Sequence, residues 1–302
     1  MSDFIWVEKY RPTTIDECIL PKSIKQTFQD FVDRGEIPNM LLSGPPGIGK
    51  TTVAKALCNQ LGADYYVING SDEGRFLDTV RNNAKNFAST VSLTSESKHK
   101  VIIIDEADNT TSDVQLLLRA SIEEFSKNCR FIFTCNYKNK IIDPLHSRCS
   151  VVDFSIHKRD KPTIAAQFFS RLTQILDEEK IDADKKVVAE LINKHFPDWR
   201  RVLNELQRYS ASGELSPKIL ANIQNNRIEV LVDAIETRKF QEIRKFILET
   251  WHGSEQELYR ELYNELMNVA EPSSIPEIIL ILSRYGFESS FAVDAEIHTL
   301  AC

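Results

Sequence analysis

The chain has 302 residues, of which 42% are hydrophobic and 27% charged, and its formal net charge is −7. These values fit a globular protein of two or three domains, and they exclude a disulfide-pinned miniprotein and a low-complexity sequence. The acidic excess lies in residues 226–302, which hold 7 basic and 14 acidic residues. We therefore expect any contact with nucleic acid to lie in the near-neutral remainder of the chain.

The six cysteines form no C-x-x-C pair, which favours reduced thiols over a disulfide framework or a metal site. The N-terminus lacks an apolar signal core. The longest apolar runs, such as VIII at 101–104, fall far short of the roughly 18 residues that a membrane span needs. The sequence predicts a cytoplasmic protein.

Short apolar runs in the first half predict the strands of a buried parallel sheet. Helical stretches separate these runs, so the first half is expected to be α/β. The runs are MLLS at 40–43, YYVING at 65–70, VIIIDEAD at 101–108, FIFTCN at 131–136 and VVDFSI at 151–156.

Charged helical patterns replace the strand-like runs after residue 156, and loop and turn residues cluster again near residue 225. We predict an α/β domain over 1–155, an all-α domain over 156–225 and a second all-α domain over 226–302. The chain ends in EIHTLAC, a helical pattern without a stop signal, so the last helix is expected to be short or truncated.

The segment from Gly44 to Thr51 fits the P-loop pattern G-x-x-x-x-G-K-[ST] between a predicted strand and a predicted helix. Its backbone N–H groups would surround phosphate oxygens, Lys50 would neutralise the β- and γ-phosphates, and Thr51 would bind Mg²⁺. An incidental glycine-rich turn is the alternative, and the strand–turn–helix order argues against it. The other residues expected to contact the nucleotide here are Gly47, Ile48, Gly49 and Thr52.

Two adjacent acids, Asp105 and Glu106, directly follow the apolar run at 101–104. A third acid, Asp108, comes two residues later. Successive side chains at a strand end point apart, so Asp105 can reach Mg²⁺ while Glu106 faces the water that attacks the γ-phosphate. The alternative is that these acids only end the strand. We interpret Asp108 as a loop or N-cap residue rather than a ligand.

Five blocks occur in order along the chain: WVEKYRPTTIDECI (6–19), GPPGIGKTT (44–52), VIIIDEAD (101–108), SRC (147–149) and PDWRR (197–201). Together they resemble the AAA+ sliding-clamp-loader ATPases, and above all the large subunits of tailed-bacteriophage (T-even-like) clamp loaders. The resemblance covers most of the chain and thins after residue 225. It implies a P-loop ATPase domain, a helical lid and a helical collar that holds a ring of subunits together. A solvated helical bundle is the alternative for the last segment.

The resemblance also implies roles for single residues. Asn136 would be the sensor that holds the attacking water or the γ-phosphate, unless it is a simple turn residue. Arg200 would be the lid arginine that contacts the γ-phosphate, with Arg201 as the alternative, although Pro197 stands where the family often has glycine. The residues expected against adenine and ribose are Val7, Glu8, Lys9, Tyr10 and Ile19, unless this segment serves domain packing.

The same resemblance makes Arg148 an arginine finger, a residue that enters the site of a neighbouring subunit. Such a residue can raise the rate of phosphoryl transfer by ~10³-fold or more. A local salt bridge is the alternative for this side chain.

Two predicted helix starts are candidates for DNA phosphate contacts, because free N–H groups and hydroxyls there suit phosphate oxygens. One presents Arg75, Arg81 and Lys85, and the other presents Thr110, Thr111 and Ser112. Plain N-capping is the alternative for the second group. We also hypothesise that Arg75 pairs with Glu106 until DNA phosphate draws it away.

The resemblance implies a Mg²⁺-dependent ATPase, stimulated by clamp and DNA, that assembles with copies of itself in a ring or spiral and with a distinct small subunit. It would open a sliding clamp and load it onto primer-template DNA, in the cytoplasm of a bacterial host if a phage encodes it, and ATP hydrolysis would release both. One alternative is another AAA+ DNA motor, such as a helicase loader or a branch-migration motor. Another is a non-hydrolysing, nucleotide-dependent assembly scaffold, against which the intact Lys50, Asp105, Glu106 and Arg148 argue.

Overall fold

A computed structural model of the chain describes residues 5–71, 85–89, 100–210, 214–215, 228–251 and 255–302. The chain divides into two compact units, residues 1–215 and residues 216–302. The predicted division into three domains, 1–155, 156–225 and 226–302, stays a prediction.

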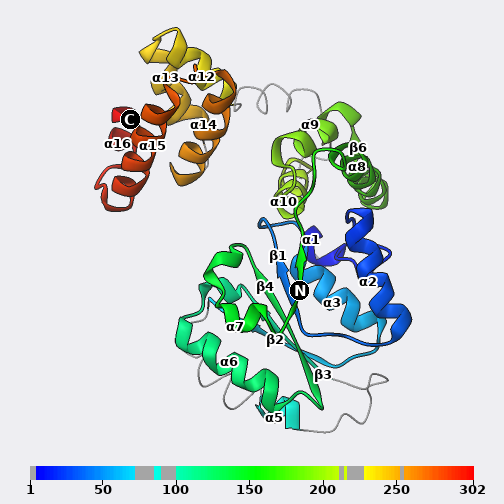
Figure 1. Ribbon diagram of the computed structural model, residues 1–302. Coiled ribbons are helices and arrows are strands. Elements are labelled where there is room, and N and C mark those ends of the chain that lie inside the picture. The colour runs from blue at the N-terminus through cyan, green and yellow to red at the C-terminus, as the bar shows by residue number, and fades with distance from the viewer. Residues whose placement is uncertain (1–4, 72–84, 90–99, 211–213, 216–227, 252–254) are drawn as a thin grey trace. The chain divides into compact units, whose positions relative to one another are not determined.

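The centre of the first unit is a parallel sheet in which all five predicted strands are present (Figure 1). Its strand order is β2-β3-β4-β1-β5. The third strand ends one residue before Glu106, whose φ of 55° lies in the left-handed region and turns the chain out of the sheet. The strands are β1 (Met40–Ser43), β2 (Tyr65–Asn69), β3 (Lys100–Asp105), β4 (Cys129–Cys135) and β5 (Ser150–Asp153).

Helices cover both faces of this sheet, so its central strands β1, β3 and β4 are mostly apolar and buried. Along β3, Val101 and Ile103 pack toward α2 (Lys22–Arg34) and α3 (Lys50–Gln60). Ile102 and Ile104 pack on the opposite side, toward α6 (Ser112–Glu124). Figure 1 shows these helices on opposite sides of the sheet. Shorter elements of the same part are α1 (Trp6–Lys9), α5 (Lys85–Ser89), η3 (Ala107–Asn109), η4 (Lys138–Lys140) and α7 (Asp143–His146).

The rest of the first unit is helical, with one addition that the sequence pattern did not predict. Two strands of two residues each, β6 (Asp182–Ala183) and β7 (Glu214–Leu215), pair in parallel. Strands this short leave no alternating pattern in a sequence. The helices are α8 (Lys161–Glu178), α9 (Lys185–His195) and α10 (Trp199–Ser210).

The second unit is a helical bundle around a small core that includes Leu231, Phe246 and Leu258. Asp294 is the N-cap of its last helix, and the Asp294 carboxylate accepts a hydrogen bond from the backbone N–H of Ile297. Among the described helices, none is both long and apolar enough to cross a membrane. The elements are α12 (Ile228–Glu236), α13 (Phe240–Lys245), η5 (Phe246–Thr250), α14 (Glu255–Val269), α15 (Ile275–Glu288), η6 (Ser289–Phe291) and α16 (Ala295–Ala301).

Candidate functional site

The turn between β1 and α3 is built around a buried lysine. Lys50 is 8% exposed, and its Nζ donates hydrogen bonds to the carbonyls of Gly44 (2.7 Å) and Pro45 (2.8 Å) and to Asn136 Oδ1 (2.9 Å). Burial holds the pKa of Lys50 below its usual value. Gly47 and Gly49 have φ values of 72° and 99°, which favour glycine and turn the chain back toward the ammonium group. The turn therefore presents one desolvated cation beside backbone N–H groups.

A carboxylate at the end of β3 lies next to this turn. Asp105 Oδ1 accepts hydrogen bonds from the hydroxyls of Thr51 and Thr134, each at 2.6 Å. The carboxyl ends of neighbouring parallel strands meet at one edge of a sheet, which is why β3 and β4 bring Asp105 and Thr134 together. Thr51 and Asp105 thus place two hard oxygen atoms side by side. Within the described residues there is no cluster of three or more His, Cys, Asp or Glu that could hold a metal ion.

Glu106 is held differently from Asp105. Its left-handed backbone conformation directs it away from the strand, and its carboxylate accepts hydrogen bonds from the hydroxyl of Ser71 and from Asn109 Nδ2 (3.1 Å). Its backbone N–H donates to Thr134 Oγ1 at 3.0 Å. The hypothesised pairing of Glu106 with Arg75 stays a prediction, because Arg75 lies outside the described residues.

Asn136 follows β4 and is positioned by an acid that the sequence analysis did not assign to the site. Asp108 is 6% exposed, and its Oδ2 accepts hydrogen bonds from the backbone N–H groups of Asn136 (3.1 Å) and Tyr137 (3.0 Å). Asp108 lies within the short helix η3 rather than in a loop or at an N-cap, and it fixes the backbone from which Asn136 reaches Lys50. An acid three residues after the strand was visible in the sequence, but its partner 28 residues away was not.

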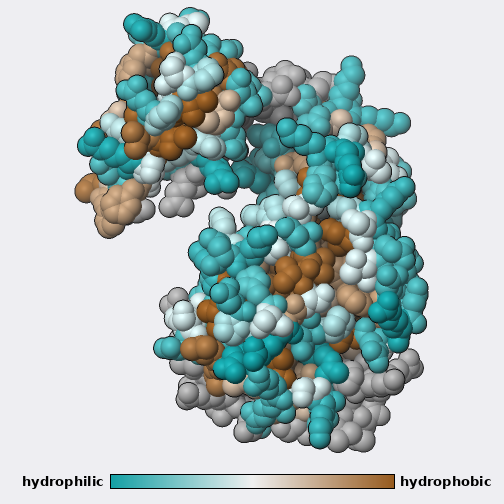
Figure 2. All heavy atoms as spheres, in the orientation of Figure 1, coloured by the Kyte–Doolittle hydropathy of each residue, from teal (hydrophilic) through white to brown (hydrophobic). Residues whose placement is uncertain are grey.

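These groups open into one cavity, and Figure 2 shows apolar side chains gathered between the sheet and helices α8–α10 of the first unit. Helices α8 and α10 contribute to its lining Phe168, Arg171, Ile175, Trp199, Arg200 and Leu203. Arg201 is not among the lining residues. The predicted site residues that line the cavity are Val7, Tyr10, Ile19, Gly47, Ile48, Gly49, Lys50, Thr51, Thr52, Asp105, Glu106, Asn136 and Arg200.

Two residues predicted against adenine and ribose, Glu8 and Lys9, are absent from this lining, and their side chains have other partners. Glu8 pairs with Arg11, whose guanidinium also donates to Thr52 Oγ1 at 3.3 Å. Lys9 Nζ lies 2.7 Å from Glu179 Oε1. Their contact with a nucleotide stays a prediction.

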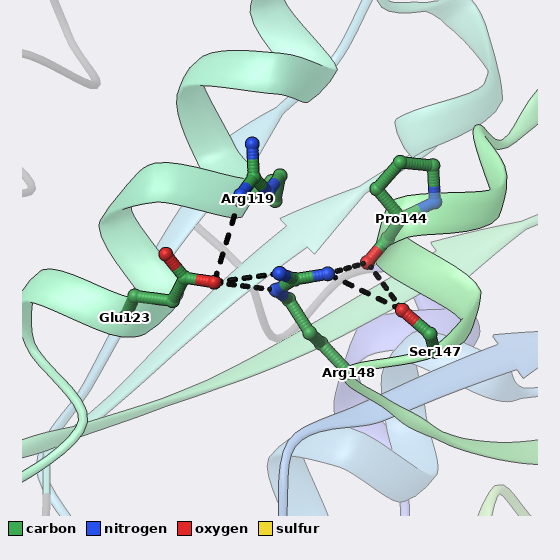
Figure 3. Close-up of polar contacts among 5 residues, drawn as sticks. All are labelled: Arg119, Glu123, Pro144, Ser147 and Arg148. Carbon is green, nitrogen blue, oxygen red and sulfur yellow. Dashed lines mark hydrogen bonds and ion pairs between the residues drawn. The ribbon is translucent and has the colours of Figure 1, made fainter.

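Arg148 lies outside the cavity lining, on the surface formed by α6 and the segment after α7 (Figure 3). Its Nε and Nη2 both donate to Glu123 Oε1, at 2.9 and 2.6 Å, and its Nη1 donates to the carbonyl of Pro144 at 2.9 Å. Arg119 approaches the same Glu123 oxygen at 3.8 Å. The Arg148 guanidinium lowers the pKa of Glu123 by hydrogen bonding. In the single chain, Arg148 is thus held by a local salt bridge.

The predicted DNA contacts are only partly described. Arg75 and Arg81 lie outside the described residues, and so does the side chain of Lys85, the first residue of α5. Thr111 is the N-cap residue of α6 but its side chain makes no capping hydrogen bond, and Thr110 Oγ1 donates to the carbonyl of Ala107 at 2.6 Å. Thr111 and Ser112 are exposed. Plain N-capping therefore does not account for this cluster of hydroxyls.

Comparison with known proteins assigns the two parts of the first unit. The model of the ATPase family associated with various cellular activities matches residues 40–159. The model of the sliding-clamp-loader large subunit, AAA+ ATPase lid domain, matches residues 160–221.

Relatives match over most of the chain. The sliding-clamp-loader large subunit of Enterobacteria phage T4 is 38% identical over 98% of this chain and 93% of its own length. That of Escherichia phage RB69 is 44% identical over 81% of this chain and 76% of its own. The replication factor C small subunit of Saccharolobus solfataricus is 33% identical over 97% of this chain and 90% of its own.

A solved structure of the Thermotoga maritima RuvB Holliday junction branch migration motor shares the fold. Its TM-score is 0.56, with 20% identity over 90% of this chain and 90% of that one. The family models and the relatives confirm both the AAA+ fold and the resemblance inferred from the five sequence blocks. The chain belongs to the sliding-clamp-loader family of AAA+ ATPases.

Proposed function

We propose that this chain is the ATP-hydrolysing motor subunit of a clamp loader, which assembles with copies of itself and with a distinct small subunit. ATP binding closes the assembly around a sliding clamp and primer-template DNA, and hydrolysis releases both. The setting is the cytoplasm of the bacterial host, in line with phage relatives. The observation that carries the proposal is that Lys50, Asp105 and Glu106 share one cavity whereas Arg148 lies outside it.

The residues at the cavity fit a nucleotide with its magnesium ion. Phosphate oxygens are better acceptors for a buried ammonium than the two carbonyls that now bind Lys50. The Thr51 hydroxyl and the Asp105 carboxylate would hold Mg²⁺, which typically binds one or two protein oxygens together with substrate phosphates. When bound, the ion neutralises charge on the phosphates.

The other residues of the cavity have separate tasks. Glu106 would orient and deprotonate the attacking water after leaving Ser71 and Asn109. Asn136, fixed by Asp108, would hold the γ-phosphate or that water, and Arg200 would carry the state of the nucleotide to the lid.

The remaining cation of the site would come from a neighbouring copy. Arg148 is 28% exposed, and its salt-bridge partner Glu123 is 53% exposed, so a phosphate of the adjoining subunit can replace that partner at low cost. The hydrolytic site would then be complete only between subunits, which makes hydrolysis depend on assembly.

DNA contact at the start of α6 belongs to the same proposal. Thr111 and Ser112 are exposed, and the first turn of a 13-residue helix offers N–H groups to a phosphate. Asp113 lies in the same turn and opposes an anion there, so the contact would use few phosphates.

Steady-state ATP hydrolysis by the chain with its small partner subunit, with and without clamp and primed DNA, tests the proposal. We expect clamp and primed DNA to stimulate hydrolysis synergistically, and we expect both Arg148→Ala and Glu106→Gln to abolish that stimulation. Stimulation by DNA alone would indicate a different AAA+ motor. No turnover under any condition would indicate a nucleotide-dependent scaffold.

A further inference from the structure

The short N-terminal helix α1 and the residues after it are bonded directly to the lid. The hydroxyl of Tyr10 donates to Glu179 Oε1 at 2.6 Å, and Lys9 Nζ lies 2.7 Å from the same oxygen. The backbone N–H of Trp6 donates to Gln207 Oε1 on α10 at 3.1 Å. Segments separated by about 170 to 200 residues are thus joined at two points.

Glu179 continues the face of α8 that lines the cavity. Phe168, Arg171 and Ile175 line the cavity at helical spacing, and Glu179 follows Ile175 by four residues in helical conformation. One stripe of the lid helix therefore forms a wall of the cavity and ends in the carboxylate that binds Tyr10 and Lys9.

The same N-terminal segment, from Trp6 to Arg11, also contacts the P-loop side of the cavity. Tyr10 lines the cavity and is 9% exposed, and its ring packs edge-on against buried Trp6 at a centroid distance of 6.4 Å. The next residue, Arg11, donates to Thr52 on α3. The segment is consequently a mechanical link between the P-loop helix and the lid.

We propose that Glu179 is a positioning residue for nucleotide binding, because it fixes the Val7–Tyr10 wall of the cavity against the lid helix. The inference rests on the proposed function of the cavity as a nucleotide site. Without Glu179, this wall and the lid keep only the Trp6–Gln207 bond of their two joining points, and an incoming nucleotide must order the rest itself. The phosphate end of the cavity, around Lys50 and Asp105, has its own partners and keeps its geometry.

The anchor acts on binding rather than on folding. The Glu179 and Lys9 side chains are 23% and 41% exposed, so truncating Glu179 opens no cavity in the core. Hydrogen bonds from Lys9 and Tyr10 lower the pKa of Glu179, which keeps this carboxylate charged at neutral pH. We expect nucleotide affinity to fall while the rate of hydrolysis at saturating ATP stays unchanged.

The test measures the equilibrium binding of fluorescent ATP to the full chain. It also measures steady-state hydrolysis at saturating ATP by the chain assembled with its small partner subunit, clamp and primed DNA. Glu179→Ala should raise the Kd by about 5- to 10-fold. Glu179→Gln, which still accepts the Tyr10 hydrogen bond, should recover part of the loss. Tyr10→Phe should weaken binding in the wild-type background, and combined with Glu179→Ala it should add little.

Glu178→Ala is the matched control, because this exposed neighbour on the same helical turn should keep the Kd of the wild type. A Glu179→Ala variant with the Kd of the control, or one with a lower saturating rate at unchanged Kd, would overturn the inference. A wild-type chain that binds ATP no better than Lys50→Ala would instead overturn the proposed function, and this inference with it. We expect all variants to have the same melting temperature. If the melting temperature falls for Glu179→Ala alone, the Kd of Glu179→Gln decides the test.

Discussion

Two basic side chains of the first unit, Lys50 and Arg148, occupy opposite physical environments. Lys50 is buried, and its own chain supplies three acceptors from the P-loop and from the end of β4. Arg148 is partly exposed and is held on the surface mainly by Glu123 (Figure 3).

Under the proposed function, this difference separates what one subunit does alone from what it needs a neighbour to do. A buried ammonium with a lowered pKa gains strongly from a charged phosphate, which is a better acceptor than the neutral oxygens that now bind it, so we expect nucleotide binding to be a property of the single chain. An exposed salt bridge contributes little and is easily exchanged, so the proposed action of Arg148 outside its own chain would cost little. Substitutions at these two residues and at their partners should separate the two roles.

Removing Arg148 should have the largest effect. We expect Arg148→Ala to lower clamp- and DNA-stimulated hydrolysis by ~10³-fold while leaving the Kd for ATP of the isolated chain unchanged. Turnover assays of the assembly and binding assays of the single chain measure the two quantities. Arg159→Ala is a suitable control, because Arg159 is 83% exposed. Equal losses in binding and turnover would place Arg148 within its own subunit's site, and the contrast between Arg148 and Lys50 would be wrong.

Removing Lys50 should act on the single chain itself. We expect Lys50→Ala to weaken ATP binding by about 100-fold, equivalent to about 2.7 kcal/mol, because the phosphates lose their buried cation. Calorimetric titration of the isolated chain measures this change. Lys22→Ala, on the exposed start of α2, should bind as the wild type does. If Lys50→Ala lost only stimulated turnover, Lys50 would resemble Arg148 and the contrast would disappear.

Alkaline pH should reproduce part of the Lys50→Ala effect. Burial lowers the pKa of Lys50 from its usual value, and the charged form binds phosphate, so affinity is complete below the lowered pKa and lost as pH rises through it. Above that pKa the Kd should rise by up to about tenfold per pH unit. Binding titrations across alkaline pH measure this, and Lys50→Arg should flatten the profile because a guanidinium stays charged. An unchanged wild-type profile would contradict the assignment.

Removing the ion pair that holds Arg148 should have the smallest effect on hydrolysis. Glu123→Gln removes the charge that holds the guanidinium, and exposed ion pairs contribute little, so we expect stimulated hydrolysis to rise by no more than about fivefold. The same turnover assay suffices, run at several concentrations of the chain because a released Arg148 should help most where assembly is limiting. A fall comparable to that of Arg148→Ala would mean that Glu123 itself takes part in the interfacial site.

Much of the fold and the phosphate end of the cavity could be predicted from the sequence, because both depend on local patterns. Buried parallel strands need continuous apolar runs, and a turn around phosphates needs glycines at particular positions followed by Lys50 and Thr51. Strand-terminal Asp105 and Glu106 follow from the same logic. These signals survive in a linear sequence because each is set by residues only a few positions apart.

The contacts that position these residues were decided by the tertiary structure. Thr134 reaches Asp105 because β4 lies beside β3, Asp108 reaches the backbone of Asn136 across 28 residues, and Glu179 binds Tyr10 across 169. The proposed exchange of Arg148 from Glu123 to a neighbour likewise depends on the exposure of this ion pair, which packing decides. The sequence by itself determined which chemical groups the protein carries and the elements on which they lie. Only folding decided which of them meet, because contacts between distant segments depend on how whole helices and strands pack and leave no periodic trace in the chain.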